Sequence, residues 1–195
     1  MFHLSKASLF TLALLGGHAS ASAILFPMYI YPKLQDVETP CAAWSGVIER
    51  YSLFSDLTSL LLTSECYSIK SHQNLAFYLV INGVGENGPG PANSQPNTDW
   101  TPCIPQLKNA SSKVTTLGYV HVRKRPGEFE LEDPTVVETN ITTYANWNIS
   151  YRPDGIFFDE SPSVFENVTR MDLLVSHARK LFGPDSPVRM RLDFP

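Results

Sequence analysis

Five short apolar runs, separated by longer segments, constrain the fold of this chain more than any other feature of its sequence. Four runs are almost continuous in Ile, Leu, Val, Phe and Tyr, and the last is weaker; they span 24–31, 75–81, 114–122, 155–158 and 188–194. An apolar run without alternating polar residues is typical of a strand that is buried on both faces. Such strands belong to parallel sheets that are covered by helices.

The segments between these runs carry apolar residues at helical spacing. Three segments show this spacing clearly, and they span 42–62, 136–147 and 163–182. The third is followed by Gly183-Pro184, a usual stop signal for a helix. Buried strands that alternate with helices predict β/α units around a parallel sheet, in a single domain.

Two architectures fit this alternation: a doubly wound sheet and a (β/α)8 barrel. A nucleotide-binding doubly wound sheet has a G-x-G-x-x-G loop after its first strand, and no such loop follows 24–31. Four predicted strands end instead in polar or aromatic side chains, namely Tyr29 and Tyr31, Asn82, Tyr119 and His121, and Asp159 and Glu160. Because barrel strands converge on one mouth at their carboxyl ends, we predict an α/β fold of the TIM-barrel-like (β/α)8 type. The five runs in this chain would form an incomplete barrel of about five β/α units.

The strongest local signal is the segment 154–160, in which an apolar strand leads directly into Asp159 and Glu160. Glycoside hydrolysis uses two carboxyl groups: one gives a proton to the leaving oxygen, and the other attacks the sugar or activates water. Neighbouring side chains on a regular strand point to opposite faces. Both carboxylates therefore reach one site only if the strand ends or bulges there. The alternative is that one is functional and the other caps the segment leading to Ser163.

Four further residues are candidates for binding a sugar. His121 can hydrogen-bond a hydroxyl or a carboxylate, and Asn82 can both donate to and accept from sugar hydroxyls. Tyr29 and Tyr119 lie at strand ends beside them. Each also has a structural interpretation, because a lone histidine is often structural, an Asn-Gly pair is a common turn, and tyrosines can line a barrel. Three tryptophans are expected to pack under helices: Trp44, Trp100 and Trp147.

The first 23 residues predict a secretory signal peptide. A lysine at position 6 precedes a short apolar stretch, and small residues in an A-x-A arrangement follow. The stretch is well short of the roughly 20 apolar residues that span a bilayer, so we expect no membrane association after cleavage. Residues 24–195 would then form one domain of a protein that is secreted or held at the cell surface. Four N-x-S/T sequons agree with export, and they begin at Asn109, Asn140, Asn148 and Asn167.

Cysteine content and charge argue against several classes of protein. Cys41, Cys66 and Cys103 allow one disulfide at most, with three possible pairings. No Cys/His spacing resembles a zinc site, so we expect no structural metal, and we expect no cofactor. The net charge is −4, and the single basic cluster, 123–125, is too short to indicate a nucleic-acid surface. We interpret it as a solvated loop after a strand. The sequence leaves the oligomeric state open.

Several segments, taken in order, resemble the spherulin-4-like proteins of spherulation-specific family 4, which include glycoside hydrolase family 135. The matching segments are 24–32, 80–82 with 88–90, 117–121, and 154–160 preceded by 144–147. Each is short, but together they occur in the family's order and cover nearly all of 24–182.

The resemblance implies a (β/α)8 barrel that acts on α-1,4-linked galactosamine or N-acetylgalactosamine polysaccharides, such as those of fungal biofilms, with Asp159 and Glu160 in the active site. It also implies an Asn-Pro-Gly-like turn after the fifth strand and a further carboxylate on a later strand. Residues 188–195 contain neither, so we expect a barrel truncated at its C-terminus. The alternatives are a non-catalytic cell-wall or carbohydrate-binding protein that keeps the groove, and a polypeptide that does not fold stably.

Overall fold

The described part of the chain covers nearly all of the predicted strands and only part of the predicted N-terminal elements. The structure, a computed structural model, describes residues 23–29, 31–33, 39–48, 69–83, 88–124 and 130–193. Residues 1–22 of the predicted signal peptide, residues 49–62 of the first predicted helix, and Cys66 lie outside the described residues.

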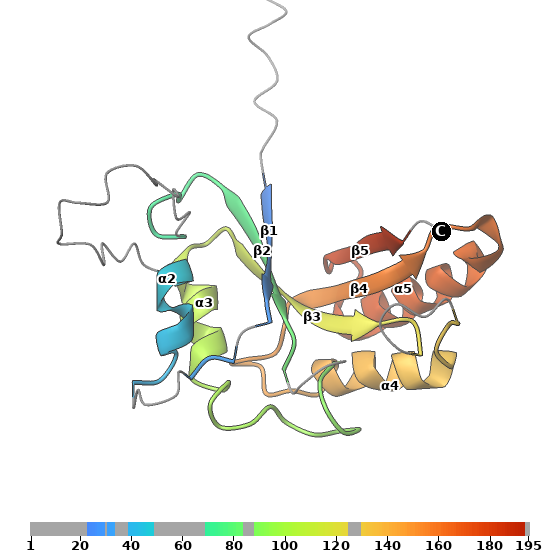
Figure 1. Ribbon diagram of the computed structural model, residues 1–195, viewed down its shortest axis with the longest axis horizontal. Helices are drawn as coiled ribbons and strands as arrows, with labels where there is room; N and C mark the ends of the chain where they lie inside the picture. Colours follow the sequence, from blue (N-terminus) through green and yellow to red (C-terminus); the bar gives the residue numbers. More distant parts are fainter. Residues whose placement is uncertain are drawn as a thin grey trace, which may run out of the picture.

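Five parallel strands form one sheet, and their order in the sheet is their order in the chain (Figure 1). The strands are β1 (Ala23–Met28), β2 (Ala76–Ile81), β3 (Val114–His121), β4 (Gly155–Pro162) and β5 (Val188–Asp193). All five coincide with predicted apolar runs, although β4 extends four residues beyond 155–158 into the polar segment. A doubly wound sheet reverses its strand order at a switch point, and the described strands show no reversal. The sheet is therefore the curled, half-barrel type that the predicted β/α units require.

The helices follow the strands as the β/α pattern predicted. They are the short 3-10 helix η1 (Ala42–Trp44) with α2 (Ser45–Ile48), then α3 (Cys103–Ala110), α4 (Pro134–Ala145), and η2 (Phe165–Asn167) with α5 (Val168–Phe182). α4 begins where the sequence provides a cap, because Asp133 accepts a hydrogen bond from the Thr135 N–H at 2.8 Å and proline occupies the first helical position. α5 ends at Gly183, which has a φ of 115°.

Alternating residues of the three central strands, β2 to β4, face two different environments. One set packs against the helices in the main core, where Leu79, Val120 and Phe158 are completely buried. The other set forms a smaller cluster on the concave face, made of Val80, Leu117, Tyr119 and Phe157 with Tyr78 beside them. Burial on both faces explains why these strands read as continuous apolar runs.

The concave face is curved enough for β5 to reach β2. The guanidinium of Arg189 on β5 lies 4.5 Å from the ring centroid of Tyr78 on β2, and its Nη2 donates to the Tyr78 hydroxyl at 2.8 Å. Two strands separate β5 from β2 in the sheet. A side-chain contact across them requires a curled sheet, as in a barrel wall.

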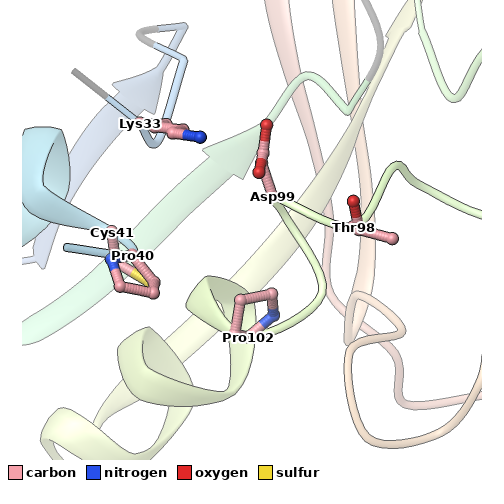
Figure 2. Close-up of a pocket in the computed structure, with 6 residues that line it drawn as sticks. All are labelled: Lys33, Pro40, Cys41, Thr98, Asp99 and Pro102. Atoms are coloured by element: carbon pink, nitrogen blue, oxygen red, sulfur yellow. The ribbon is translucent and has the colours of Figure 1, made fainter. Parts of the chain in front are cut away.

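A disulfide between Cys41 and Cys103 selects one of the three pairings that the sequence allowed, with the Cα atoms 5.3 Å apart. It ties the segment before η1 to the first residue of α3, beside a small pocket (Figure 2). Trp44 and Trp100 pack edge-to-face nearby, with ring centroids 5.1 Å apart. The predicted packing role of the three tryptophans is confirmed, because Trp44, Trp100 and Trp147 are all buried.

Within the described ranges, no helix has both the length and the apolar character needed to cross a membrane.

Candidate functional site

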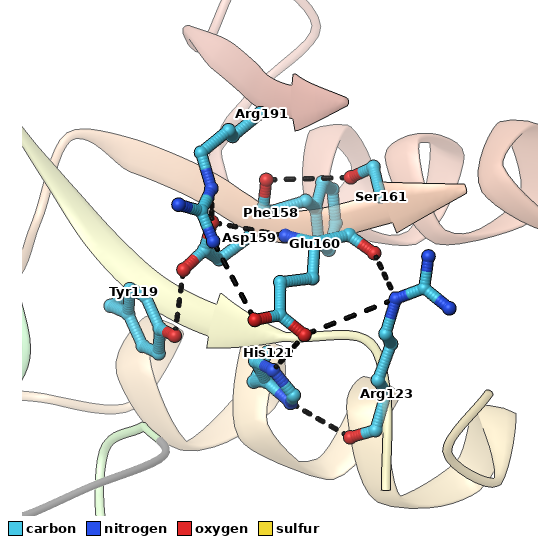
Figure 3. Close-up of polar contacts among 8 residues, drawn as sticks. All are labelled: Tyr119, His121, Arg123, Phe158, Asp159, Glu160, Ser161 and Arg191. Atoms are coloured by element: carbon cyan, nitrogen blue, oxygen red, sulfur yellow. Dashed lines mark hydrogen bonds and ion pairs between the residues drawn. The ribbon is translucent and has the colours of Figure 1, made fainter. Parts of the chain in front are cut away.

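A bulge in β4 brings two adjacent carboxylates into one polar cluster (Figure 3). The pairing of β4 with β5 shifts register between Phe158 and Ser161. At this point Glu160 has a φ of 53°, in the left-handed region that residues with a side chain rarely adopt. The bulge breaks the alternation of the strand, so Asp159 and Glu160 both contact residues of the same cluster. This is the geometry that the sequence analysis required for both carboxylates to reach one site.

Asp159 is surrounded by hydrogen-bond donors. Its Oδ2 accepts from the Tyr119 hydroxyl at 2.9 Å, and its Oδ1 accepts from the Glu160 N–H at 3.0 Å. The Nε of Arg191 forms an ion pair with Oδ1 at 2.5 Å, and the Asp159 side chain is only 8% exposed. Because all three partners donate, the arrangement fits an ionised carboxylate.

Glu160 shares a proton with His121. The Nδ1 of His121 lies 2.8 Å from the carbonyl oxygen of Arg123, and a carbonyl only accepts, so Nδ1 carries a hydrogen. The Nε2 of the same ring lies 3.0 Å from Glu160 Oε2. This contact is a hydrogen bond only if a proton sits on Nε2 or on Oε2. As a hydrogen bond, the contact is either an imidazolium donating to a carboxylate or a carboxylic acid donating to an imidazole.

Arg123, two residues after the end of β3, supports the bulge. Its Nε donates to the backbone carbonyl of Glu160 at 3.2 Å and lies 3.9 Å from Glu160 Oε2. The interpretation of 123–125 as a solvated loop is therefore wrong for Arg123, which is buried at 6% exposure. The physical reason is that the chain still runs beside β4 just after β3 ends, so that two residues past β3 the Arg123 guanidinium is paired with the bulge.

Arg191 is a second cluster residue that the sequence analysis did not identify. It extends from β5, and besides its ion pair with Asp159 it lies 3.6 Å from Glu160 Oε1. The sequence does contain a pattern that could have identified it: in the weak run 188–194, Arg189 and Arg191 alternate with apolar residues. Such alternation places both arginines on one face of the strand, and that face is the concave one.

Two tyrosines extend the cluster and remain hydrogen-bond donors. Burial, followed by the charge of Asp159, raises the pKa of Tyr29 to about 12, with Arg191 opposing the shift. Burial and the hydrogen bond to Asp159 raise the pKa of Tyr119 as well. The two rings meet edge-to-face with centroids 5.4 Å apart, while 51% of Tyr29 stays exposed. One face of the cluster thus presents an aromatic surface to solvent.

Asn82, unlike the other predicted sugar-binding residues, hydrogen-bonds a loop residue and not the carboxylate cluster. Its Oδ1 accepts a hydrogen bond from the Gly88 N–H at 3.2 Å, so its side chain holds the loop that follows β2. Tyr29, Tyr119 and His121 do gather with the carboxylates. In the described part of the chain, no group of three His, Cys, Asp or Glu side chains is arranged to hold a metal ion.

The parallel, curled half-barrel sheet defines a mixed α/β protein, and the two carboxylates lie at the carboxyl end of one of its strands. The sequence model of spherulation-specific family 4 matches residues 23–190. The chain belongs to this family, which confirms the family-level resemblance seen in the sequence. Comparison with curated proteins and with solved structures gave no match.

Proposed function

We propose that this protein is a secreted glycoside hydrolase of the family 135 type that cleaves α-1,4-linked galactosamine or N-acetylgalactosamine polysaccharide. The observation that carries the proposal is the bulge at Glu160, which places two carboxylates with different surroundings in one cluster. Glycosidases need two carboxyl groups in different protonation states at the same bond. Family membership agrees with this chemistry, and the substrate class comes from the family resemblance.

The surroundings of the two carboxylates support a separate role for each. Glu160, through the proton it shares with His121, protonates the glycosidic oxygen as the bond to the anomeric carbon breaks. Asp159, which accepts hydrogen bonds from the Tyr119 hydroxyl and the Glu160 N–H, faces the positive charge that develops on the sugar. Water supplies the hydroxyl group of the product, and the proton released by that water restores the pair of Glu160 and His121.

Exposed aromatic side chains at the carboxyl edge of the sheet support a polysaccharide substrate. Tyr29 follows β1 and is 51% exposed, whereas Phe165 follows β4 and is 89% exposed. Aromatic faces pack on the apolar faces of sugar rings, and carbohydrate sites use them as platforms. Tyr29 follows β1 and Phe165 begins η2 after β4, so the two residues flank β2 and β3, and a polymer that crosses this edge of the sheet can contact both.

One observation favours the alternative, a non-catalytic carbohydrate-binding protein. Arg191 is ion-paired with both Asp159 and Glu160, and a carboxylate engaged in this way has fewer oxygen lone pairs for a substrate. The Arg191 side chain is 58% exposed, so the hydrolase proposal requires it to swing aside when sugar binds. In the binding-protein alternative it stays and contacts sugar hydroxyls.

Export is part of the proposal. Two of the four sequon asparagines, Asn109 and Asn148, are exposed in the structure, and Asn140 and Asn167 are partly exposed. Exposed acceptors suit a glycoprotein of the secretory pathway. Expression in a eukaryotic secretory host tests this: the protein should appear in the medium and lose mass on treatment with a peptide N-glycosidase. Retention of the unmodified chain inside the cell would contradict it.

The hydrolase proposal is tested by release of reducing ends from purified α-1,4-galactosaminoglycan. The protein is compared with Asp159→Asn plus Glu160→Gln, and with Asp172→Asn as a matched control on exposed α5 surface. Activity that the double variant lacks and the control keeps supports the hydrolase. Polymer binding without cleavage by the folded protein would replace it with the binding-protein alternative.

A further inference from the structure

A small polar pocket lies among the segments that follow β1 and β2 (Figure 2). It has a volume of about 240 Å³ and is lined by Lys33, Pro40, Cys41, Thr98, Asp99 and Pro102. Lys33 lies in the segment after β1, and Thr98 and Asp99 lie in the segment after β2. Segments that follow the strands of a β/α sheet all lie at its carboxyl edge. None of the lining residues belongs to the cluster around Asp159.

The pocket has fixed walls. The disulfide between Cys41 and Cys103 joins the two segments that form it. Asp99 accepts a hydrogen bond from the Tyr31 hydroxyl at 2.5 Å, and Asn97 donates to the same hydroxyl at 3.0 Å. The Tyr31 ring also packs edge-to-face on Trp100, with centroids 6.1 Å apart, while 45% of Tyr31 stays exposed. Tyr31 is therefore held in one orientation with part of its surface open to solvent.

The chemistry of the lining suits a neutral, hydroxyl-rich ring. Asp99 offers a carboxylate, Lys33 offers an ammonium group, and Thr98 offers a hydroxyl. Lys33 and Asp99 both line the pocket (Figure 2), so the lining carries no net formal charge and favours no ionic ligand of either sign. Two prolines and the disulfide supply apolar walls. The volume is below the roughly 300–1,000 Å³ of pockets for drug-sized ligands, which limits the occupant to about one sugar residue.

We propose that this pocket, together with Tyr31, is an accessory subsite for one uncharged N-acetylhexosamine residue of the polysaccharide. Tyr29 and Tyr31 are two residues apart after β1, and Tyr29 borders the carboxylate cluster. A chain bound at the carboxylates can therefore continue along this segment into the pocket. The inference rests on the proposed function for its ligand and extends it by favouring the N-acetylated residue over the cationic, deacetylated one.

Binding without turnover separates this inference from the hydrolase proposal. Affinities for an α-1,4-linked N-acetylgalactosamine oligosaccharide and for its deacetylated form are measured by calorimetry in the Asp159→Asn plus Glu160→Gln protein. Further changes of Asp99→Ala and Lys33→Met are made in that background, with Asp172→Ala as the control on α5. Circular dichroism melting confirms that each variant is folded.

The subsite predicts that the N-acetylated oligosaccharide binds more tightly than the deacetylated one. Asp99→Ala should weaken its binding by about tenfold, the usual effect of losing a charged hydrogen bond. Lys33→Met should reverse the preference, because the pocket then carries only the Asp99 charge. Equal affinities in all folded variants, or a parent that prefers the deacetylated form, would overturn the subsite. If the protein hydrolyses the polymer but the Asp99 and Lys33 variants bind it unchanged, the subsite is overturned and the hydrolase proposal stands. If binding depends on Asp99 but the protein hydrolyses nothing, the subsite stands and the hydrolase proposal fails.

Discussion

At the scale of single residues, Glu160 determines the character of the candidate site. Its left-handed backbone, with a φ of 53°, turns its side chain to the same cluster as Asp159. Such a conformation costs a residue with a side chain about 1–2 kcal/mol relative to glycine. Strain of this kind is found at functional sites, where the surrounding structure maintains it. Here Arg123 contributes by holding the Glu160 carbonyl.

A pair of substitutions measures this strain. Glu160→Gly and Glu160→Ala both remove the carboxylate and its contacts with His121 and Arg191, but only glycine adopts the left-handed conformation without cost. We expect the glycine variant to be more stable than the alanine variant by about 1 kcal/mol, as measured by urea unfolding. An alanine variant at least as stable as the glycine variant would show that the bulge is not strained.

The raised pKa values of two tyrosines predict a loss of stability at alkaline pH. The pKa of Tyr29 is raised to about 12, and burial also raises the pKa of Tyr144. A raised pKa in the folded state stabilises the fold below the ordinary value of 10, and this contribution is lost as the pH rises through the folded-state pKa. We expect part of the tyrosine absorbance to titrate only above pH 11 or so, together with unfolding. Complete titration of all tyrosines near pH 10 in the folded protein would contradict the burial.

At the scale of the elements, close packing between strands and loops leaves some positions without space for a methyl group. A Cβ atom on Gly155, the first residue of β4, would lie 2.0 Å from the carbonyl oxygen of Pro187. The same carbonyl accepts the N–H of Ile156 at 3.1 Å, which aligns β5 with β4. Because β4 carries both carboxylates, this contact also helps to position the site.

Two glycine-to-alanine changes test that packing against a matched control. Gly155→Ala should destabilise the fold by about 3 kcal/mol, since the backbone must move to relieve the overlap. Gly46→Ala, on exposed α2 with nothing within 4 Å of the new Cβ, should instead stabilise it by about 0.5–1 kcal/mol. Thermal unfolding of both proteins gives the comparison. Similar stabilities for the two variants would contradict the described packing of β4 against Pro187.

The disulfide between Cys41 and Cys103 also stabilises the arrangement of the elements. It closes a loop with a sequence separation of 62 residues, and the chain-entropy relation gives a stabilisation of about 4 kcal/mol for such a loop. Replacing both Cys41 and Cys103 with alanine should lower the free energy of unfolding by that order, as measured in urea. A reduced wild-type protein serves as the comparison. Unchanged stability in both would show that the bridge does not form in the folded protein.

At the scale of the whole molecule, periodicity predicted the sheet, and the site was predicted only in part. Apolar runs identified all five strands, most clearly the central strands β2 to β4, which are buried on both faces. Strand ends also identified Tyr119, His121, Asp159 and Glu160. Arg123 and Arg191 were missed because their roles depend on a bulge and on the curl of the sheet, and neither feature has a periodic signature in the sequence. Asn82 was grouped with the site because position along a strand does not reveal which loop a side chain holds.

The proposed hydrolase chemistry is tested most directly by measuring the role of each carboxylate separately. Cleavage of the polymer is compared with cleavage of a nitrophenyl α-glycoside of an N-acetylgalactosamine oligosaccharide, whose leaving group needs no proton. Glu160→Gln should lose at least about 100-fold on the polymer, the usual contribution of general acid catalysis, and keep most of its activity on the nitrophenyl substrate. Asp159→Asn should lose activity on both. The opposite pattern, equal losses for both variants on both substrates, or a folded parent protein that cleaves neither substrate would contradict the assignment.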